Sequence, residues 1–417
     1  MTTAVELRPA FLPARDERDS AWRDHPAPDQ VERLRAAYPT EREYDAMLTR
    51  KMLRRAQPAA KVPTLEQLGA ALDSFLRDHV DGSFTVTELR WLSGGASKIQ
   101  VAFSLDWDDP VEGRTRSRLV LRMEPTESLN STSRRRELQL LAAMSGVVPV
   151  PRTYWLDAQG SWFPEPTIVY AFADGVIKPS AIRGRVSGTG NPFDPELRAS
   201  LGAQFTEALA RIHTADVSGA DLSAFDLPAV GTTQSPLWQL NRARRVWEED
   251  RPEDFPVIEV VANWLEDHLP PVDQVSVVHG DFRAGNFLFD EERREITAWL
   301  DWERGHLGDR HRDLAWSTLP VFGNYTADGH TLLVSGLVPY EGFLERYQEL
   351  SGLEVDPVRL HFYRVFAAYQ LVVSNLASSY RVVRLGRSHQ DILLAWIEGV
   401  SYPFAHEMLR MIEEGPA

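Results

Sequence analysis

The sequence predicts an α+β protein in which a small antiparallel sheet precedes a larger, mostly helical region. Runs with strand composition concentrate between residues 84 and 175 and are interrupted by one helical segment. From Pro195 onward, most segments have the apolar periodicity of helices. We therefore expect an N-terminal extension (1–62), a sheet-rich region (63–175) and a helical region (176–417).

Length and composition are those of a globular protein with two or three domains, since the chain has 417 residues. A formal net charge of −15 disfavours broad binding to nucleic-acid phosphates, although a local basic pocket could still bind a small anion. The absence of cysteine excludes disulfides, thiolate metal sites and cysteine nucleophiles. The chain starts without a signal-like apolar run, and Val365–Tyr380 reads as a buried helix, so we expect a cytoplasmic protein.

The first 62 residues are rich in Arg, Glu and Pro and contain one predicted helix, at about residues 41–55. A docking arm, an oligomer contact and a loosely held extension all fit this composition. A second helix begins at Thr64, which forms a capping box with Gln67. Its apolar face is marked by Leu65, Leu68, Leu72, Phe75 and Leu76.

The sheet-rich region continues with predicted strands at residues 84–92, 99–107, 118–124 and 166–175, and a helix at 134–146. A Gly-rich polar loop follows. Later helices are expected at residues 196–215, 241–250, 257–269, 341–350, after Asp356 and at 392–412, with short strands in VSVVHGD, NFLFD and ITAWLDW.

The stretch VVHGDFRAGNFLFD places an acid, a guanidinium and an amide between apolar strands. NFLFDEERREITAWLD reads as a β-hairpin with a charged turn. In an antiparallel pair the start of one strand lies beside the end of the other, so Asn286 and Asp301 should be neighbours. Asp281 lies on the loop that leads into this hairpin. Two carboxylates and an amide should therefore meet at one end of it.

This combination fits phosphoryl transfer. An Asn oxygen and a carboxylate suit Mg²⁺, and a second carboxylate can take the proton of a hydroxyl group. Upstream, Gly94 and Gly95 lie between two strands and could cover phosphates, although a plain turn is the alternative. Arg122 lies in an apolar strand and needs a partner, for which Glu137 on the next helix is a candidate.

These motifs resemble the aminoglycoside phosphotransferase family, which has a protein-kinase-like fold. The resemblance covers about residues 64–400. Its motifs are LSGGASK, LVLRMEP, RREL, VPVPR, IVYAFADG, VVHGDFRAGNFLFD and AWLDWERGHLGDRHRDLAW. Within the family, the chain looks most like the kinase-like domains fused to acyl-CoA dehydrogenases. The resemblance implies a bilobal fold and ATP- and Mg²⁺-dependent transfer of the γ-phosphoryl group to a small-molecule hydroxyl, such as that of a hydroxyacyl-CoA.

The resemblance also implies roles for single residues. Asp281 would be the catalytic base, and Asn286 and Asp301 would bind Mg²⁺. Arg122 would contact the nucleotide phosphates in place of the usual lysine, with Glu137 as its partner. An Arg is a planar fork rather than a point charge, so its phosphate contact would be bidentate. The rest of the nucleotide site would comprise Gly94, Gly95, Ser97, Tyr170 and the backbone at Ala171 and Phe172.

Other polar residues have less specific readings. Arg122 could instead be a purely structural ion pair, and Arg283 could either contact an anionic substrate or neutralise nearby carboxylates. We expect His279 to hold the catalytic loop. Asp309 and Asp313 are expected to tie the following helix to that loop. A solvated helix face is expected for Arg242, Arg244 and Arg245, although an acidic CoA-like group could use them.

Three other functions remain open. These are an aminoglycoside antibiotic phosphotransferase, a nucleotide-binding pseudokinase, and a metal-dependent hydrolase. The hydrolase would use His306, Asp309, His311 and Asp313, whose spacing fits no common zinc motif. We expect a small-molecule hydroxyl acceptor as the partner, with neither nucleic acid nor membrane. The helical region and the loop at residues 183–191 should shape the acceptor pocket, and the sequence predicts no oligomeric state.

Overall fold

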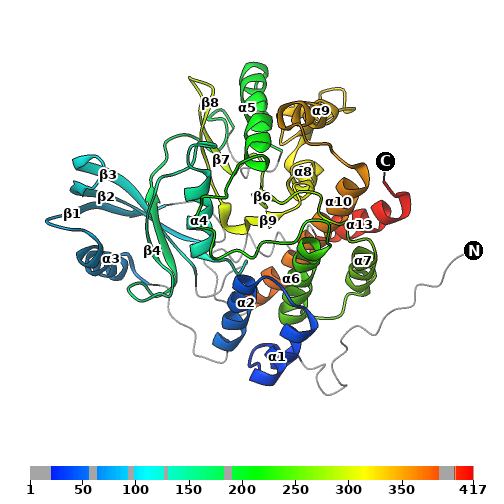
Figure 1. The fold of residues 1–417 in the computed structure, drawn as a ribbon, viewed down its shortest axis with the longest axis horizontal. Helices are drawn as coiled ribbons and strands as arrows, with labels where there is room; N and C mark the ends of the chain where they lie inside the picture. The colour runs from blue at the N-terminus through cyan, green and yellow to red at the C-terminus, as the bar shows by residue number, and fades with distance from the viewer. Residues whose placement is uncertain are drawn as a thin grey trace, which may run out of the picture.

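The computed structural model describes residues 20–55, 63–92, 98–125, 130–182, 190–384, 399 and 401–416. It has two lobes (Figure 1). The N-lobe consists of a five-stranded antiparallel sheet with helices α3 and α4, and the C-lobe is mostly helical. The predicted α+β architecture, with a small sheet preceding a larger helical part, is confirmed.

The N-lobe sheet has the strand order β1-β2-β3-β5-β4. Its strands are β1 (Thr85–Trp91), β2 (Ile99–Asp109), β3 (Gly113–Met123), β4 (Thr153–Asp157) and β5 (Thr167–Ala171). Strand β4 was not predicted, and β3 begins earlier than expected. Helix α3 (Leu65–His79) has the predicted capping box, in which Gln67 N–H donates to the Thr64 hydroxyl over 3.2 Å.

The two faces of this sheet have different neighbours. Leu119, Leu121 and Val169 belong to the core that the sheet forms with α3. The alternate residues Val120 and Ile168 belong to the main core, which extends into the C-lobe. Arg122 lies on the second face, because it is two residues from Val120 and opposite Ile168. The register of β3 therefore directs Arg122 toward the junction of the lobes, where helix α4 (Arg134–Met144) also lies.

The N-terminal strap, Ser20–Arg55, comprises a 3-10 turn (Ser20–Arg23) and helices α1 (Pro28–Ala37) and α2 (Arg42–Arg54). The predicted helix at residues 41–55 is confirmed as α2, whereas α1 was not predicted. Of the three readings of this extension, a loosely held one does not fit these helices, because their apolar side chains are buried. Those side chains are Val31, Leu34, Tyr44, Met47, Leu48 and Met52.

The strap contacts both lobes. Lys51 Nζ lies 2.7 Å from Asp250 Oδ2 in the C-lobe, and Arg54 pairs with Glu165 of the N-lobe over 2.5 Å. Figure 1 shows α2 beneath α4 and beside α6. The strap thus joins the two lobes on one side of the molecule.

The C-lobe contains most of the helices. They are α5 (Pro195–His213), α6 (Gln234–Asp250), α7 (Pro256–Asp267), α8 (His311–Ser317), α9 (Tyr340–Ser351), α10 (Pro357–Val373), a π-helical turn (Ser374–Ser379), α11 (Tyr380–Arg384) and α13 (Ser401–Glu414). The apolar segment 365–380 is buried inside this lobe, as predicted. The predicted helix at 392–412 is described only in its second half. No helix of the described residues has the length and apolarity needed to cross a bilayer.

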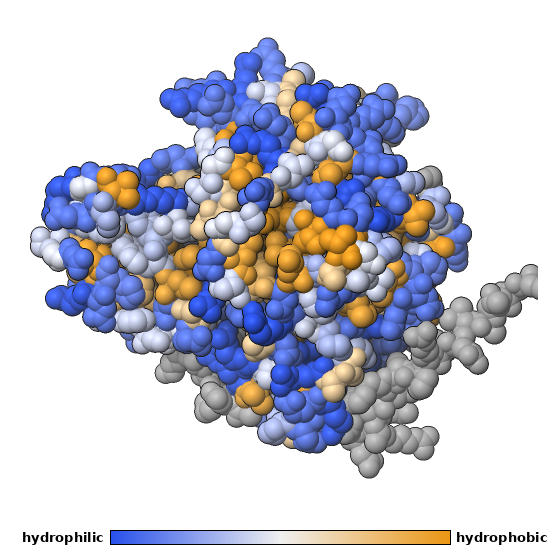
Figure 2. Space-filling view, viewed as in Figure 1, coloured by the Kyte–Doolittle hydropathy of each residue, from blue (hydrophilic) through white to orange (hydrophobic). Residues whose placement is uncertain are grey.

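Three small sheets position the loops of the C-lobe. Strand β6 (Ser276–Val278) pairs with β9 (His306–Gly308), and β7 (Phe287–Asp290) pairs with β8 (Glu295–Trp299). The third sheet comprises β10 (Asn324–Tyr325), β11 (Leu332–Val334) and β12 (Val338–Pro339), and the 3-10 turns are η3 (Trp302–Arg304) and η4 (Pro320–Phe322). The predicted hairpin is therefore confirmed as β7–β8. Figure 2 shows apolar side chains gathered near the centre of the face in view, with hydrophilic ones around them.

The arginines of α6 do not form the solvated face that the sequence suggested. Arg242 and Arg245 are 8% and 0% exposed. Arg245 pairs with Asp45 of the strap over 2.6 Å, and Arg244 pairs with Glu266 of α7 over 2.9 Å. The expectation failed because the strap covers this face of α6.

Candidate active site

The β7–β8 hairpin brings Asn286 and Asp301 to the same end. Phe287 pairs with Trp299, and Leu300 N–H donates to the carbonyl of Asn286 over 2.8 Å. Asp301 follows directly, with a left-handed backbone (φ 65°) that turns the chain into η3. This backbone conformation is uncommon for a non-glycine residue and costs on the order of 1–3 kcal/mol. Residues in such strained conformations are often found at functional sites. The side chain of Asp301 remains 32% exposed.

Asp281 lies on the loop between β6 and β7, next to the hairpin end. The amide nitrogen of Asn286 donates to the backbone carbonyl of Asp281 over 2.8 Å, so the amide oxygen of Asn286 is turned elsewhere. The Asp281 carboxylate accepts hydrogen bonds from Trp316 Nε1 over 2.6 Å and from Arg283 Nε over 2.9 Å. The two carboxylates and the amide expected at this hairpin end are thus held by the hairpin and its loop.

The electrostatic surroundings keep Asp281 ionised. Burial alone would raise the pKa of its carboxyl group, but the charges of Arg283 and Arg304 outweigh burial, so this pKa is lowered. A carboxylate in this state can accept a proton at neutral pH. Of the two readings for Arg283, neutralisation of a neighbouring carboxylate is the one that its pairing with Asp281 supports.

The start of this loop is held by His279 and Asp313. Nε2–H of His279 donates to the carbonyl of Leu300 over 3.0 Å, and its Nδ1 accepts the N–H of Asp281 over 3.2 Å. Asp313 accepts the backbone N–H groups of His279 and Gly280, over 2.6 and 2.8 Å. Gly280 has φ +80°, and a Cβ there would lie 2.5 Å from the carbonyl oxygen of Arg304. The hydrogen bonds of His279 and Asp313 are those expected for residues that hold the loop.

Asp309 acts differently from the expectation. Its Oδ1 accepts from the backbone N–H of His311 over 3.0 Å and from Nδ1 of the same residue over 2.7 Å, which holds the start of α8 rather than the loop. Asp313 contacts His213, and His306 Nδ1 lies 3.3 Å from the carbonyl of Arg304. Within the described ranges, no three His, Asp or Glu side chains are grouped to hold a metal. The hydrolase hypothesis therefore has no support from this cluster.

A buried ionic cluster lies beside Asp301, at the junction of the lobes. Arg122 pairs with Glu137 over 3.3 Å, as predicted, and also with Glu303 over 2.8 Å and with Asp301. The cluster also contains Lys98, which lies 3.3 Å from Glu303. Arg122 thus links the N-lobe sheet to the residue proposed as a metal ligand.

Sequence reasoning missed several members of this ionic cluster, namely Lys98, Glu124, Arg134 and Glu303. Burial opposes ionisation of Glu303, but Lys98, Arg122 and Arg134 together hold its pKa well below its ordinary value. One signal was available, because Glu303 follows Asp301 by two residues in LDWE.

The predicted adenine-binding segment lies at the end of β5. Tyr170 is buried, which raises the pKa of its hydroxyl to about 12. The N–H groups of Ala171 and Phe172 donate to the carbonyls of Arg152 and Arg118, each over 2.8 Å. Because these two N–H groups are already bonded, a backbone contact with adenine would have to be made by carbonyl groups of this segment or by residues after Phe172. Gly94, Gly95 and Ser97, together with loop residues 183–189, lie outside the described residues.

A comparison with protein families identifies the chain. The model described as "Phosphotransferase enzyme family" matches residues 102–353, which is more than half of the sequence. The chain belongs to the phosphotransferase enzyme family. The match begins in β2 and ends after α9, so it includes Arg122, Asp281, Asn286 and Asp301.

Curated relatives of this phosphotransferase include proteins named after acyl-CoA dehydrogenases. "Acyl-CoA dehydrogenase family member 10" of Mus musculus is 28% identical over 248 residues, which cover 58% of this chain and 21% of that protein. "Probable acyl-CoA dehydrogenase IBR3" of Arabidopsis thaliana is 26% identical over 275 residues, covering 62% and 32%. The chain thus spans only a fifth to a third of the length of these relatives. The predicted resemblance to kinase-like domains in such proteins is confirmed.

Solved structures show the same fold. A Ralstonia eutropha protein provisionally assigned as an aminoglycoside phosphotransferase has a TM-score of 0.61 and 20% identity, with 84% of this chain and 99% of that chain covered. The choline kinase of Streptococcus pneumoniae has a TM-score of 0.50 and 16% identity, with 83% and 98% covered. The predicted protein-kinase-like fold is confirmed.

Proposed function

We propose that this phosphotransferase is a small-molecule kinase, which moves the γ-phosphoryl group of ATP to a hydroxyl group with the help of Mg²⁺. The observation that carries the proposal is the hairpin end, which holds Asp281, Asn286 and Asp301 together beside the ionic cluster of Arg122. The family membership supports phosphoryl transfer as the reaction. ATP, Mg²⁺ and the roles of the single residues are part of the proposal.

In this proposal Asp281 orients the acceptor hydroxyl and takes its proton. The hydrogen bond from Trp316 and the pairing with Arg283 fix the direction of the carboxylate, and its lowered pKa keeps it deprotonated. His279, Gly280 and Asp313 hold the loop, so the base keeps its place during the reaction.

Asn286 and Asp301 fit the needs of Mg²⁺. Mg²⁺ is bound through one or two protein oxygens and completes its shell with phosphate oxygens and water. The hydrogen bond from Asn286 to Asp281 leaves the amide oxygen free to face a cation, and the carboxylate of Asp301 is partly exposed. When bound, the metal would supply charge neutralisation for the transferred group.

Arg122 would bind nucleotide phosphates. It is buried and held by Glu137 and Glu303, which keep its guanidinium in place even when its contact with Asp301 changes. An Arg presents two parallel N–H groups to a phosphate, so the contact would be bidentate. The domain boundaries that accompany this scheme, with a nucleotide-binding region at 63–175 and an acceptor-binding region at 176–417, are likewise proposed.

Among acceptors, the names of the curated relatives favour a hydroxylated acyl compound over an aminoglycoside. A pseudokinase is disfavoured because a nucleotide-binding module needs no carboxylate aligned by an indole N–H. An aminoglycoside is a polycation, and the arginines near Asp281 would repel it.

The experiment that tests the proposal compares the wild type with Asp281→Asn. The variant should bind ATP with Mg²⁺ as the wild type does, because Asp281 is not placed as a metal ligand. Phosphoryl transfer should fall by about 10²- to 10⁴-fold, which is typical for loss of a general base. ADP release with a hydroxyl acceptor and calorimetric titration with ATP provide the two readouts. Unchanged turnover would remove Asp281 from the role of base, and absent ATP binding by the wild type would refute the kinase.

A further inference from the structure

Among the described residues, two buried arginines, Arg242 and Arg312, differ from the other buried arginines in their ion pairing. The other buried arginines all have a carboxylate within ion-pair distance; they are Arg23, Arg55, Arg122, Arg134, Arg136, Arg245, Arg251, Arg310 and Arg381. Arg242 and Arg312, which are 8% and 2% exposed, have no such partner among the described residues. An uncompensated buried charge is costly, so an anion from outside the chain is a suitable partner for these side chains.

A third arginine, Arg304 of η3, is half-buried and also lacks a described carboxylate within ion-pair distance. The guanidinium carbons of Arg304 and Arg312 lie 4.5 and 4.9 Å from the ring centre of Trp316. Nε1 of the same indole donates to Asp281. Arg304 and Arg312 are therefore separated from the proposed base by a single side chain.

Unsatisfied hydrogen-bond donors lie in the same place. Nη1 of Arg312 and the hydroxyl of Tyr44 are buried without a hydrogen-bond partner in the protein. The Tyr44 ring lies 3.6 Å from the guanidinium carbon of Arg242, and Arg304 is within electrostatic reach of both residues. Burial and the neighbouring charge of Arg304 lower the pKa of Arg312 to about 9. An anion here would relieve the repulsion between like charges and satisfy these donors.

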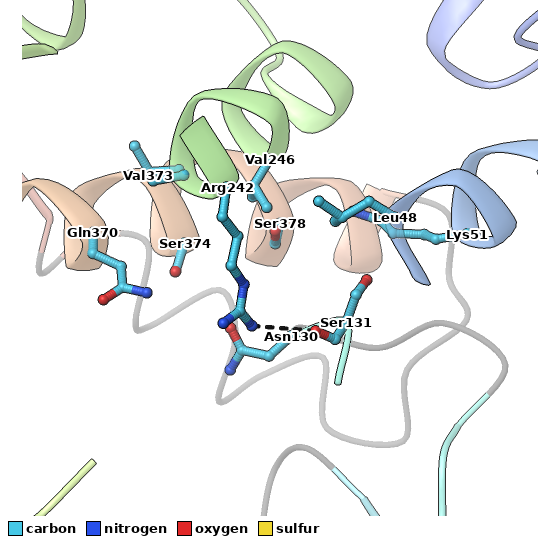
Figure 3. A pocket seen from close by; sticks show the side chains of 11 residues that line it. Leu48, Lys51, Asn130, Ser131, Arg242, Val246, Gln370, Val373, Ser374 and Ser378 are labelled. Carbon is cyan, nitrogen blue, oxygen red and sulfur yellow. Dashed lines mark hydrogen bonds between the residues drawn. The ribbon is translucent and has the colours of Figure 1, made fainter. Parts of the chain in front are cut away.

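A small pocket lies beside Arg242. Figure 3 shows Arg242 extending from α6 into it, with a hydrogen bond of 3.2 Å to the carbonyl of Ser131. Gln370 lines the same pocket and accepts a hydrogen bond from Arg312. The lining also includes hydroxyl groups, such as those of Ser374 and Ser378. The pocket therefore has a mainly polar lining, and it connects Arg242 to the partner of Arg312.

From this geometry we infer that Arg242, Arg304, Arg312 and Tyr44 form an anion subsite for the phosphoryl acceptor. The inference rests on the proposed kinase function and names its substrate class. The acceptor is a small hydroxyl compound that also carries a carboxylate or a phosphate a few bonds from the hydroxyl, because the subsite lies one indole away from Asp281. Guanidinium forks bind both kinds of anion through paired N–H groups. The N-terminal strap contributes Tyr44, so it takes part in acceptor recognition.

Inorganic phosphate is the probe for the subsite. Its binding to the full chain is measured by calorimetry, with the Mg²⁺ complex of AMP-PNP present so that phosphate cannot enter the nucleotide subsites. The wild type should bind phosphate, and Arg304→Met should weaken this binding by about tenfold or more, since a charge-assisted hydrogen bond is lost. Tyr44→Phe should weaken it by a smaller factor. Absence of phosphate binding to the wild type, or equal binding to Arg304→Met, would overturn the subsite.

A matched control separates the lost hydroxyl from a general effect on packing. Tyr369 is another buried tyrosine whose hydroxyl has no hydrogen-bond partner in the protein, and it lies near Arg244 instead. Tyr369→Phe should leave phosphate affinity unchanged, and an equal loss in both tyrosine variants would count against the subsite. AMP-PNP affinity, measured on the same samples, reports on the kinase proposal by itself. If AMP-PNP fails to bind, the phosphate titration is run without it and still tests the anion subsite.

An acceptor screen then distinguishes the two kinds of anion. ADP release is followed with small hydroxy acids, with phosphorylated alcohols, and with uncharged or cationic polyols that include aminoglycosides. Turnover should occur with one of the two anionic classes, and the active class identifies the group held by the arginines. Equal kcat/KM for uncharged or cationic acceptors would contradict the inference, and so would turnover with neither anionic class.

Discussion

At the scale of single residues, the carboxylate of Asp281 is held by two donors of different kinds, the indole N–H of Trp316 and the guanidinium of Arg283. The indole is neutral and rigid, whereas the guanidinium adds charge. Trp316 therefore contributes mainly to the direction of the carboxylate. It touches no reacting atom in the proposed scheme and acts as a positioning residue.

Trp316→Phe keeps a ring against Arg304 and Arg312 but removes the N–H donor. We expect kcat to fall by roughly tenfold, with the KM for ATP unchanged, because one hydrogen bond to an ionised group is lost. Steady-state kinetics at neutral pH provide the check. Trp264→Phe, on α7, should change neither value, and an unchanged kcat in Trp316→Phe would argue against positioning.

Asp301 combines a functional side chain with an unusual backbone. Asn tolerates the left-handed region nearly as well as Asp, so Asp301→Asn should fold normally while losing the charge that we assign to Mg²⁺. Asp301→Ala should be less stable by about 1 kcal/mol because Ala does not tolerate this backbone. Titration of ATP with and without Mg²⁺ tests the assignment. A Mg²⁺ dependence of ATP affinity that is the same in Asp301→Asn and in the wild type would contradict it.

At the scale of helices and strands, the hairpin was predictable because its signals are local. Two apolar runs bracket a charged turn, and the antiparallel register then brings Asn286 and Asp301 together. Strand β4 was missed because its run, TYWLD, is short.

The strap and the ionic cluster could not be predicted in the same way. In the sequence, Arg242 and Arg245 resemble a charged, solvated helix face. In the structure the strap covers them, and they contact Tyr44 and Asp45, which lie about 200 positions earlier in the chain. Lys98 and Glu303 become partners only when the lobes meet. Contacts between residues far apart in the chain leave no periodic pattern in the sequence from which they could be predicted.

The strap holds α4 through Glu41, whose carboxylate lies 3.1 Å from Arg136 Nη2. Both groups are buried, so Glu41→Gln should leave Arg136 without its compensating charge and lower the free energy of unfolding by roughly 3 kcal/mol. Urea unfolding measures this change.

The matched control for Glu41→Gln is Asp29→Asn, which breaks the exposed pair of Asp29 and Arg33 on α1. Exposed pairs contribute about 0–1 kcal/mol, so this variant should unfold nearly like the wild type. Equal losses in the two variants would mean that burial of the Glu41–Arg136 pair does not matter.

At the scale of the whole molecule, buried neutral histidines make stability depend on pH. Burial is the main cause that lowers the pKa of His306 from 6.5 to about 3. Between these values the unfolded chain binds one proton more than the folded chain. Stability is therefore retained above about pH 6.5 and lost as pH falls, by up to about 1.4 kcal/mol per pH unit for this group.

His306→Gln removes this titration. Between pH 6.5 and pH 5, the free energy of unfolding should fall less steeply with decreasing pH in the variant than in the wild type. The two slopes should differ by up to about 1.4 kcal/mol per pH unit, which is the contribution of His306. Urea unfolding at several pH values measures both slopes. His330→Gln, at an exposed histidine, should keep the wild-type slope. Parallel curves for His306→Gln and the wild type would show that His306 is not buried in its neutral form.

The strap also has a consequence for how the protein is made. Arg23 and Lys51 bond to residues 225 and 199 positions later in the chain. A ribosome adds roughly 5–20 residues per second, so α1 and α2 leave the exit tunnel on the order of ten seconds before their partners exist. During that interval their apolar sides have nothing to cover them, which makes this stretch a natural client for chaperones. The strap is thus made well before its partners in α6 but is among the last segments to reach its final place.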